Sequence, residues 1–360
     1  MIRAAAAIVV ALAAVAAQAQ FTIGTLAEDL ELPWSLAFLP DGSMLVTELP
    51  GRLRTVRDGE LLETPVAGVP DVYFAGQGGL FDIALDPDFE TNRTIYLSYA
   101  HGNRDANATR LLRAVLDGNE LRDQQVIFTA QPYKRAALHF GGRIAFLPDG
   151  TLLMPTGDGF TWREEAQKLD TSLGKIVRIG RDGSIPVDNP FTGREDARPE
   201  IWSYGHRNPQ AILFDPVSGN VYAHEHGARG GDELNLIEPG RNYGWPAITH
   251  GRDYNYARIT PYTEYPGMEQ PLVHWTPSIA PAGMAIYRGD LFPDWQGDLF
   301  VAALVERAVR RLDMENGRVI GQQILFSELG ERMRDVRVGP EGALYLLTDS
   351  SDGRVLRVMP

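Results

Sequence analysis

The stretch LAFLPDGSMLVTE, residues 36–48, places an apolar run on each side of a Pro-Asp-Gly turn. Two apolar runs joined by such a turn predict a β-hairpin. Related stretches follow at residues 82–100, 144–158, 211–227, 287–304 and 336–349. Sustained helical periodicity is almost absent, and the segment ALVERAVRRL (303–312) fits a helix or a hairpin equally well. The pattern therefore predicts an all-β chain.

Six similar hairpins in one chain indicate a repeat architecture. Radially arranged blades of four strands bury their faces against one another and leave only short edges, whereas a two-sheet sandwich would not explain the repetition. We therefore expect residues 20–360 to form a single six-bladed β-propeller. Residues 241–282 are rich in proline and aromatic residues and lack periodicity. They are expected to form long loops on the active-site face.

The N-terminal stretch MIRAAAAIVVALAAVAAQAQ has the organisation of a secretory signal. Arg3 precedes an apolar run that is too short to cross a bilayer, and Ala-Gln-Ala at 17–19 is typical of a cleavage site. We expect residues 1–19 to be a signal peptide and the protein to be periplasmic or secreted; an uncleaved anchor is the alternative. No later segment is apolar enough to predict membrane insertion.

The composition limits the possible partners. The 360 residues include no cysteine, so stability must come from core burial, bound metal or closed topology rather than from disulfides. The formal net charge is −13, which disfavours nucleic acid and anionic lipid as partners. An anionic ligand would need a local cluster of arginines.

Such a cluster occurs in ERMRDVRV (331–338), where Arg332 and Arg334 lie two residues apart. At strand spacing both side chains point the same way. Two guanidiniums together favour an anion between them, and arginine is suited to carboxylates. The alternative is a solvated strand face that pairs with Asp335 or a nearby glutamate.

Two further motifs carry residues suited to proton transfer and to polarised oxygens. LHFGGRI (138–144) contains His139, whose side chain titrates near neutral pH and suits a general base. Its Gly-Gly pair lets the backbone, or something large and flat, come close. In YGHRNPQAI (204–212), Arg207 and Asn208 offer a cation and an amide, although this motif alone is more often a turn.

The run GARGGDELNLIEPGRNYGWP (227–246) suggests hard-cation chemistry. Calcium prefers carboxylate and backbone oxygens in glycine-rich loops, and Asp232 and Glu233 supply charge here. The alternative is a pair of acidic residues at an ordinary turn. His224 and His226 could suggest a transition metal, but a third ligand is not evident and core histidines are the stronger interpretation.

Taken in order, the motifs resemble the glucose/sorbosone dehydrogenase family, the soluble aldose sugar dehydrogenases that depend on pyrroloquinoline quinone (PQQ). The resemblance extends from Pro33 to Arg357. It rests on GQGGL (76–80), HFGGR (139–143), GHRNPQ (205–210), GDELNLI (231–237), NYGWP (242–246), PSIAPAG (277–283) and RMRDV (332–336).

The resemblance implies two cofactors, PQQ and Ca²⁺, and assigns residues to them. The implied positions are Arg332 and Arg334 on the PQQ carboxylates; Gln77, Arg207 and Asn208 around the quinone; His139 and Arg207 in catalysis; Gly227 and Ala228 as carbonyl ligands of the calcium beside PQQ; and Glu233 and Tyr243 as ligands of a second, structural calcium. Glycines 141 and 142 are expected to clear space beside the cofactor so that the histidine reaches the substrate.

The implied reaction oxidises an aldose at C1 to a lactone. His139 removes the proton of the anomeric hydroxyl, hydride passes to PQQ, calcium polarises the quinone, and Arg207 steadies the developing oxyanion. Electrons then pass to a periplasmic electron acceptor.

The sequence departs from the family at three places. Val305 stands where glucose-specific members have a lysine, Leu138 replaces the acid before the histidine, and Thr276 replaces an aromatic residue. These departures favour a broad aldose specificity.

Two other classes of function remain open at this point. A calcium-dependent propeller lactonase or other hydrolase would need several Asp, Glu and Asn side chains around a metal in the central channel. A non-catalytic extracellular binding propeller is also compatible, because a fold does not fix a function. That interpretation predicts that His139, Arg332 and Arg334 lie scattered.

Overall fold

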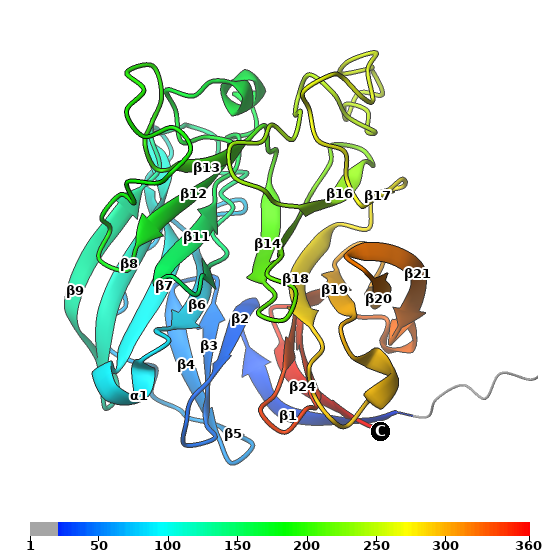
Figure 1. Cartoon of the computed structure of the whole chain (residues 1–360). Coiled ribbons are helices and arrows are strands. Elements are labelled where there is room, and N and C mark those ends of the chain that lie inside the picture. The colour runs from blue at the N-terminus through cyan, green and yellow to red at the C-terminus, as the bar shows by residue number, and fades with distance from the viewer. Residues whose placement is uncertain (1–20) are drawn as a thin grey trace, which may run out of the picture.

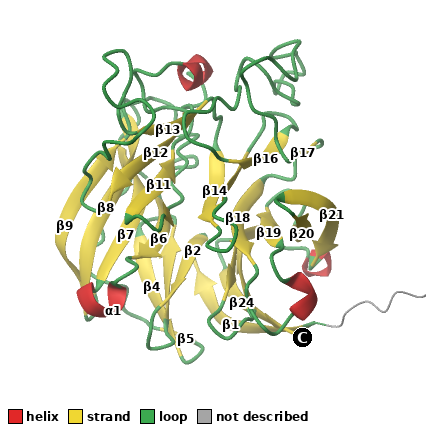
Figure 2. Ribbon diagram, viewed as in Figure 1, coloured by secondary structure: helices red, strands yellow, loops and turns green. Residues whose placement is uncertain are grey.

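The computed structural model describes residues 21–360, so the predicted signal peptide at 1–19 lies outside the described residues. The chain forms six four-stranded antiparallel sheets arranged as the blades of a β-propeller, which confirms the predicted fold class (Figures 1 and 2). In blade order the strands are β2 (Pro33–Phe38), β3 (Met44–Glu48), β4 (Arg52–Arg57) and β5 (Glu60–Leu61); β6 (Leu80–Leu85), β7 (Thr94–Gly102), β8 (Asn107–Asp117) and β9 (Glu120–Thr129); β10 (Ala145–Phe146), β11 (Thr151–Pro155), β12 (Lys175–Gly180) and β13 (Ile201–Tyr204); β14 (Pro209–Phe214), β15 (Val221–Glu225), β16 (Asp232–Leu236) and β17 (Val273–Trp275); β18 (Pro281–Ile286), β19 (Leu299–Ala303), β20 (Ala308–Glu315) and β21 (Arg318–Leu325); and β22 (Met333–Val338), β23 (Leu344–Thr348), β24 (Gly353–Met359) and β1 (Thr22–Leu30).

The repeated Pro-Asp-Gly turn has a local physical cause. In the first blade, Asp41 Oδ1 accepts hydrogen bonds from the backbone N–H of Ser43 at 3.0 Å and from its hydroxyl at 2.6 Å. In the third blade, Asp149 makes the same two bonds to Thr151, at 2.9 and 2.6 Å. The glycine between them, Gly42 in the first blade, has a φ of 85°, a region that L side chains rarely adopt. The aspartate and the glycine therefore set the hairpin turn through contacts within a few residues.

The ring closes by pairing the two ends of the described chain. Strand β1 is the outermost strand of the sheet formed by β22, β23 and β24, with Thr22 opposite Met359. Leu30, near the end of this seam, is completely buried. This pairing ties the N-terminal strand into the C-terminal blade and closes the ring, so it supplies stability that a chain without disulfides needs.

In the part of the chain that the structure describes, helical structure is limited to short turns. These are α1 (Phe89–Asn92) and the 3₁₀ segments Arg163–Gln167, Pro293–Trp295 and Ser327–Leu329. The ambiguous segment 303–312 contains the end of β19, the turn at 304–307 and the start of β20, so the hairpin interpretation is correct. In residues 21–360, no helix is long and apolar enough to cross a membrane.

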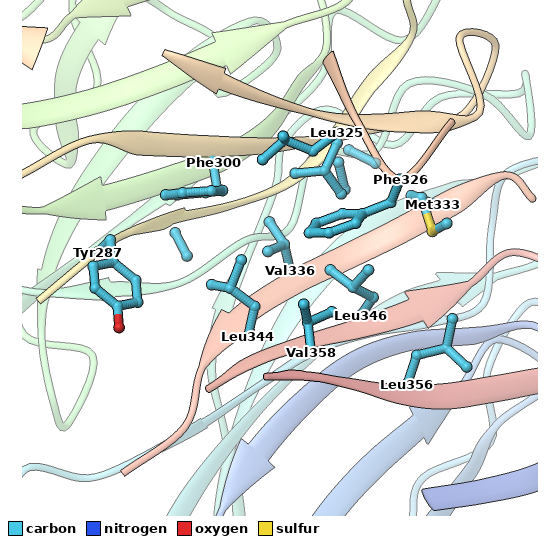
Figure 3. Packing of buried hydrophobic residues seen from close by; sticks show 14 of the residues in the cluster. Tyr287, Phe300, Leu325, Phe326, Met333, Val336, Leu344, Leu346, Leu356 and Val358 are labelled. Atoms are coloured by element: carbon cyan, nitrogen blue, oxygen red, sulfur yellow. The ribbon is translucent and has the colours of Figure 1, made fainter. Parts of the chain in front are cut away.

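The core lies between neighbouring blades. Figure 3 shows Tyr287 and Phe300 of the fifth blade facing Val336 and Leu344 of the sixth, and all four side chains are completely buried. Full burial of one large apolar side chain contributes about 1.5–3 kcal/mol. Each blade therefore needs its neighbour in order to bury its second face.

Candidate functional site

Loops at one end of the ring build the candidate site. The predicted site motifs fall where the first strand of a blade begins or where its second strand ends, and antiparallel pairing brings these two points together. Arg332 directly precedes β22, for example, and Asp349 directly follows β23. The backbone N–H of Asp349 donates to the carbonyl of Arg332 at 2.7 Å. Residues far apart in the sequence therefore share one end of the propeller.

A cavity of about 380 Å³ lies at this end. Its wall combines aromatic side chains, two guanidiniums, two amides and one carboxylate. The members used below are Trp34, Gln77, Phe140, Arg332, Arg334 and Asp349. Flat apolar walls combined with a few polar groups are typical of a small-molecule site.

Arg332 and Arg334 lie together on the cavity wall, and one carboxylate joins them. Arg332 Nε donates to Asp349 Oδ2 at 2.8 Å, and Arg334 Nη2 donates to Asp349 Oδ1 at 2.8 Å. Burial acts to raise the pKa of Asp349, but the two guanidiniums hold that pKa below its usual range. The partner is therefore Asp349 and not Asp335, which the solvated-face alternative had named.

Asp335 instead belongs to a buried ion network beneath the cavity. The Arg143 guanidinium reaches Asp82 at 3.1 Å and Asp335 at 3.2 Å, and its centre lies 3.9 Å from the ring of Trp34. Arg337 donates to the same two carboxylates, at 3.2 and 2.9 Å. The network joins three blades and supports the Trp34 wall from below.

His139 lies beside this cavity and is held in one orientation. Its backbone N–H donates to Gln77 Oε1 at 2.8 Å, and its Nδ1 lies 2.6 Å from Asp158 Oδ1. The Asp158 carboxylate also accepts from Phe160 N and from Trp245 Nε1, both at 2.7 Å. The sequence had suggested a weaker orientation because Leu138 replaces an acid. In the structure, Asp158 supplies that acid from the end of the hairpin.

The protonation states follow from these contacts. Burial lowers the pKa of His139 below its usual range, and Asp158 opposes this shift only in part. Burial acts to raise the pKa of Asp158, but the hydrogen bond with His139 holds it below its usual range. The neutral imidazole therefore carries its proton on Nδ1, facing an ionised carboxylate, and leaves Nε2 as a proton acceptor. The backbone of His139 has a φ of 52°, a strained conformation that is common at functional sites.

Residues Gly141 and Gly142, after His139, have a packing reason of their own to be glycine. A Cβ on Gly141 would lie 2.4 Å from the carbonyl oxygen of Pro155, and one on Gly142 would lie 3.0 Å from the Phe81 ring. Both glycines also have positive φ, at 70° and 106°. They permit close backbone packing against neighbouring protein atoms, and Gly141 also lines the cavity, so the expectation that they clear space beside a cofactor stays a prediction.

Arg207 connects the histidine to the predicted calcium loop. Its carbonyl accepts from the backbone N–H of Asp158 at 2.8 Å, and its Nη1 donates to the carbonyls of Gly227 at 2.5 Å and His226 at 3.1 Å. The backbone carbonyl of Asn208 accepts from His226 N at 3.3 Å. The GHRNPQ motif and the GARGG loop therefore meet at this side chain. Ala228 lies in the same loop and lines an adjoining cleft.

A second, very small cavity holds the other predicted metal residues. Its volume is about 10 Å³, room for one water-sized species, and Glu225, Gly227, Glu233 and Tyr243 line it. Glu225 and Glu233 are direct partners on β15 and β16. Burial and the neighbouring Glu225 raise the pKa of Glu233 to about 8. Two buried carboxylates at a cavity of this size fit a hard cation.

The other predicted ligands constrain how a cation could be held. The Tyr243 hydroxyl donates to Leu236 O at 2.7 Å and accepts from Glu238 N at 2.8 Å, so only the Tyr243 backbone carbonyl is available. In residues 21–360, no group of three or more His, Cys, Asp or Glu side chains gathers at one point. Backbone oxygens would therefore have to complete a calcium site.

The histidine pair suggested for a transition metal is otherwise engaged. His226 Nε2 lies 2.7 Å from the carbonyl of Pro281, and burial lowers the pKa of His226 to about 4. His224 is completely buried, and neither of its ring nitrogens has a hydrogen-bond partner within the described chain. These contacts favour the core interpretation of both histidines.

A flat tricarboxylate fits the larger cavity by its chemistry. Arg332 and Arg334 supply forked donors, Gln77 an amide, and Trp34 a ring with the charge of Arg143 behind it. Asp349 uses part of the donor capacity of the two arginines. Val305 also lines the cavity, so an apolar side chain occupies the position where the resemblance expected a lysine.

The fold and this site define a β-propeller sugar dehydrogenase class, and the sequence comparison agrees. Residues 30–357 match the family described as Glucose / Sorbosone dehydrogenase, and the chain belongs to that family. Aldose sugar dehydrogenase YliI of Escherichia coli is 42% identical over 351 residues, which cover 96% of this chain and 94% of that protein.

Solved structures show the same similarity in three dimensions. The soluble aldose sugar dehydrogenase from Escherichia coli in the apo-form matches with a TM-score of 0.92 at 41% identity, covering 95% of this chain and 100% of that chain. The PQQ-bound form of aldose sugar dehydrogenase from Streptomyces coelicolor matches with a TM-score of 0.78 at 28% identity, covering 95% and 99%.

Sequence reasoning missed three acidic residues of the site, Asp158, Glu225 and Asp349. Each lies at or just after the end of the second strand of its blade. Asp158 and Asp349 are the last residues of the hairpin stretches 144–158 and 336–349, and Glu225 ends β15 within the stretch 211–227. The repeated position of these acids was the signal that could have found them.

Proposed function

We propose that this chain is a PQQ- and calcium-dependent aldose sugar dehydrogenase that oxidises aldoses at C1 to lactones. Membership of the glucose/sorbosone dehydrogenase family supports the reaction class. The PQQ-bound Streptomyces coelicolor structure supports the cofactor. The observation that carries the proposal is the convergence of Arg332, Arg334 and Gln77 on one cavity, with His139 bonded to Gln77.

The binding roles follow from the side chains that line the cavity. When bound, PQQ supplies the two-electron acceptor for the hydride that leaves C1 of the sugar. Arg332, Arg334 and Gln77 would hold its polar edge, and Asn208 lies in the adjoining motif. Calcium supplies Lewis acidity, and the carbonyls of Gly227 and Ala228 would hold it. Glu233 and the carbonyl of Tyr243 would hold a second, structural calcium.

The catalytic roles belong to His139 and Arg207. Neutral His139 accepts the anomeric hydroxyl proton at Nε2, and the Asp158 carboxylate stabilises the imidazolium that forms. Arg207 supplies a buried positive charge toward the oxygen that becomes negative. Loss of that proton together with hydride from C1 converts the sugar into its lactone. Val305 in place of a lysine is consistent with a broad aldose specificity.

The two alternative functions have less support. A lactonase would need free carboxylates around a metal in the central channel, but Asp82 and Asp335 are paired with Arg143 and Arg337 there. A non-catalytic propeller predicted scattered site residues, whereas Arg332 and Arg334 share a cavity with the Gln77 that binds His139. The periplasmic location and the electron acceptor remain proposals from the N-terminal sequence and the resemblance.

The test reconstitutes the protein and removes the base. The apo-protein is mixed with Ca²⁺ and PQQ, and dye reduction is followed with glucose, xylose and maltose. The variant His139→Gln should lower turnover by about 10²- to 10⁴-fold, the usual contribution of a general base, while PQQ binding measured by absorbance persists. His274→Gln, at an exposed position, is the matched control. Lactone hydrolysis without PQQ, or unchanged turnover in the His139 variant, would contradict the proposal.

A further inference from the structure

A wide cleft leads outward from the cofactor cavity. Its volume is about 680 Å³, and it shares His226, Ala280 and Val305 with the cavity. Tyr254 and Tyr256, from the long loop at 241–282, line the cleft and are 52% and 62% exposed. The cleft is therefore open to solvent and continuous with the proposed reaction site.

The inner end of this cleft lies next to the catalytic residues. The Tyr254 hydroxyl is 3.2 Å from Arg207 Nη2, and the Tyr254 ring lies 6.2 Å from the ring of Phe160. Phe160 in turn lies 5.1 Å from the His139 ring, edge to face. A sugar with C1 near His139 would therefore extend its remaining carbons along Tyr254 into the cleft.

Two arginines stand opposite each other in the wall of this cleft. Arg229 and Arg252 form an isolated antiparallel bridge, in which Arg229 N donates to Arg252 O at 2.8 Å. Residues directly opposite in such a bridge project to the same side, and like charges in that position are destabilising. Both residues line the cleft and are exposed.

Neither guanidinium is neutralised by the protein. Within residues 21–360, the side chains of Arg229 and Arg252 make no ion pair and no hydrogen bond to a protein oxygen. The Arg229 guanidinium instead lies 4.1 Å from the centre of the Tyr256 ring, which holds it in place. In a chain with a net charge of −13, two adjacent arginines without acidic partners form a local positive site.

We propose that Arg229 and Arg252 bind an anionic group carried by the aldose at the end remote from C1. This inference rests on the proposed function and names its substrate class, an aldose with a carboxylate or a phosphate. Guanidiniums bind both groups through paired N–H donors. The two sources are a uronic acid and an aldose phosphate.

The test measures binding with sugars that cannot react. Methyl β-D-glucuronide, methyl glucoside 6-phosphate and neutral methyl glucoside are titrated by calorimetry into the protein loaded with Ca²⁺ and PQQ. At least one anionic glycoside should bind about tenfold more tightly than the neutral one. Arg229→Gln and Arg252→Gln should each remove most of that preference and leave methyl glucoside binding unchanged. Arg258→Gln, an exposed arginine of the same loop outside this cleft, is the matched control.

The outcomes separate this inference from the proposed function. Tighter binding of the glucuronide identifies a carboxylate, and tighter binding of the phosphate identifies an aldose phosphate. Equal binding of anionic and neutral glycosides overturns the inference, as does an Arg252 variant that behaves like the Arg258 variant. Anion-selective binding without dye reduction by reducing sugars would instead retain this site and remove the dehydrogenase proposal.

Discussion

Replacing Asp158 by asparagine should impair catalysis far more than it impairs folding. The carboxylate accepts three hydrogen bonds, two on Oδ1 from His139 and Phe160 and one on Oδ2 from Trp245. In Asp158→Asn the shape is kept and the charge is lost. With the amide oxygen toward His139, the new NH₂ group faces the Trp245 N–H, and two donors then oppose each other.

The magnitude follows from the bonds that change. A hydrogen bond to a charged group contributes about 1.5–3 kcal/mol, so loss of imidazolium stabilisation predicts about a 10- to 150-fold lower kcat. If the flipped amide also imposes the wrong histidine tautomer, the loss approaches about 10⁴-fold, the size seen for such a change in a serine protease triad. The free energy of unfolding should fall by only about 1–3 kcal/mol.

The pH profile distinguishes this role from a structural one. Burial already lowers the pKa of His139, so in the wild type the acidic limb of kcat/KM should lie below the ordinary histidine value of about 6.5. Asp158 favours the protonated imidazole, and its removal should therefore move the limb to still lower pH. Trp245→Phe removes one donor but keeps the carboxylate, so its limb should not move. An Asp158→Asn enzyme with wild-type kcat and an unshifted limb would refute the assigned role.

Three further perturbations test the ion pairs and the metal. Arg143→Met should lower the free energy of unfolding in urea by about 3–5 kcal/mol, because it removes the fully buried cation from Asp82 and Asp335 and leaves Arg337 as their one remaining cationic partner within residues 21–360; a loss below 1 kcal/mol would contradict this. The pKa of Asp349 is lowered in the folded state, so its stabilisation is present above the ordinary value of about 3.9 and is lost as the pH falls. Asp349→Asn should therefore lose less stability than the wild type on going from pH 6 to about pH 3, measured by denaturant titration. Chelation of calcium should lower the Tm of the wild type more than that of Glu233→Gln, because the variant has already lost the structural calcium and keeps only the one at Gly227 and Ala228; equal shifts in both would remove Glu233 from the metal site.

The hairpins could be predicted because their cause is local. The Asp41 and Asp149 turns are set within a few residues, so the sequence pattern alone indicated six repeated units. The ring closure has no comparable signal. Thr22 pairs with Met359 through strands whose local sequences match many partners equally well. Only the need to close the ring selects that pairing.

The arginines of the site could also be predicted, but not the surroundings that tune them. Two arginines that lie two residues apart on a strand favour an anion between them, so Arg332 and Arg334 could be predicted as an anion-binding pair. Whether that anion was a ligand or a protein carboxylate could not be decided from their own segment. The anion is the carboxylate of Asp349. Its position depends on the register between β22 and β23, and that register is irregular between Met333 and Asp335.

The pairing of the first two strands of each blade nevertheless explains why the site residues meet, because the same pairing recurs from blade to blade. In an antiparallel hairpin, a residue just before the first strand lies beside a residue just after the second. His139 and Asp158 meet in this way in the third blade, His206 and Glu225 in the fourth. Arg332 and Asp349 do so in the sixth blade.

The first and fifth blades do not follow this pattern, and the fifth blade shows what the charged pairs supply. In the fifth blade, Ala280 precedes β18 and Leu304 follows β19, so apolar side chains occupy the positions that carry charged pairs in the third, fourth and sixth blades. Val305, next to Leu304, is shared by the cofactor cavity and the outer cleft. The charged pairs of the third and sixth blades fix the base and the anion-binding groups. The apolar residues of the fifth blade leave an opening without fixed polar partners. Substrate choice should therefore depend on the loop at 241–282, which carries Arg252, and on Arg229, because these residues lie outside the repeated pairs.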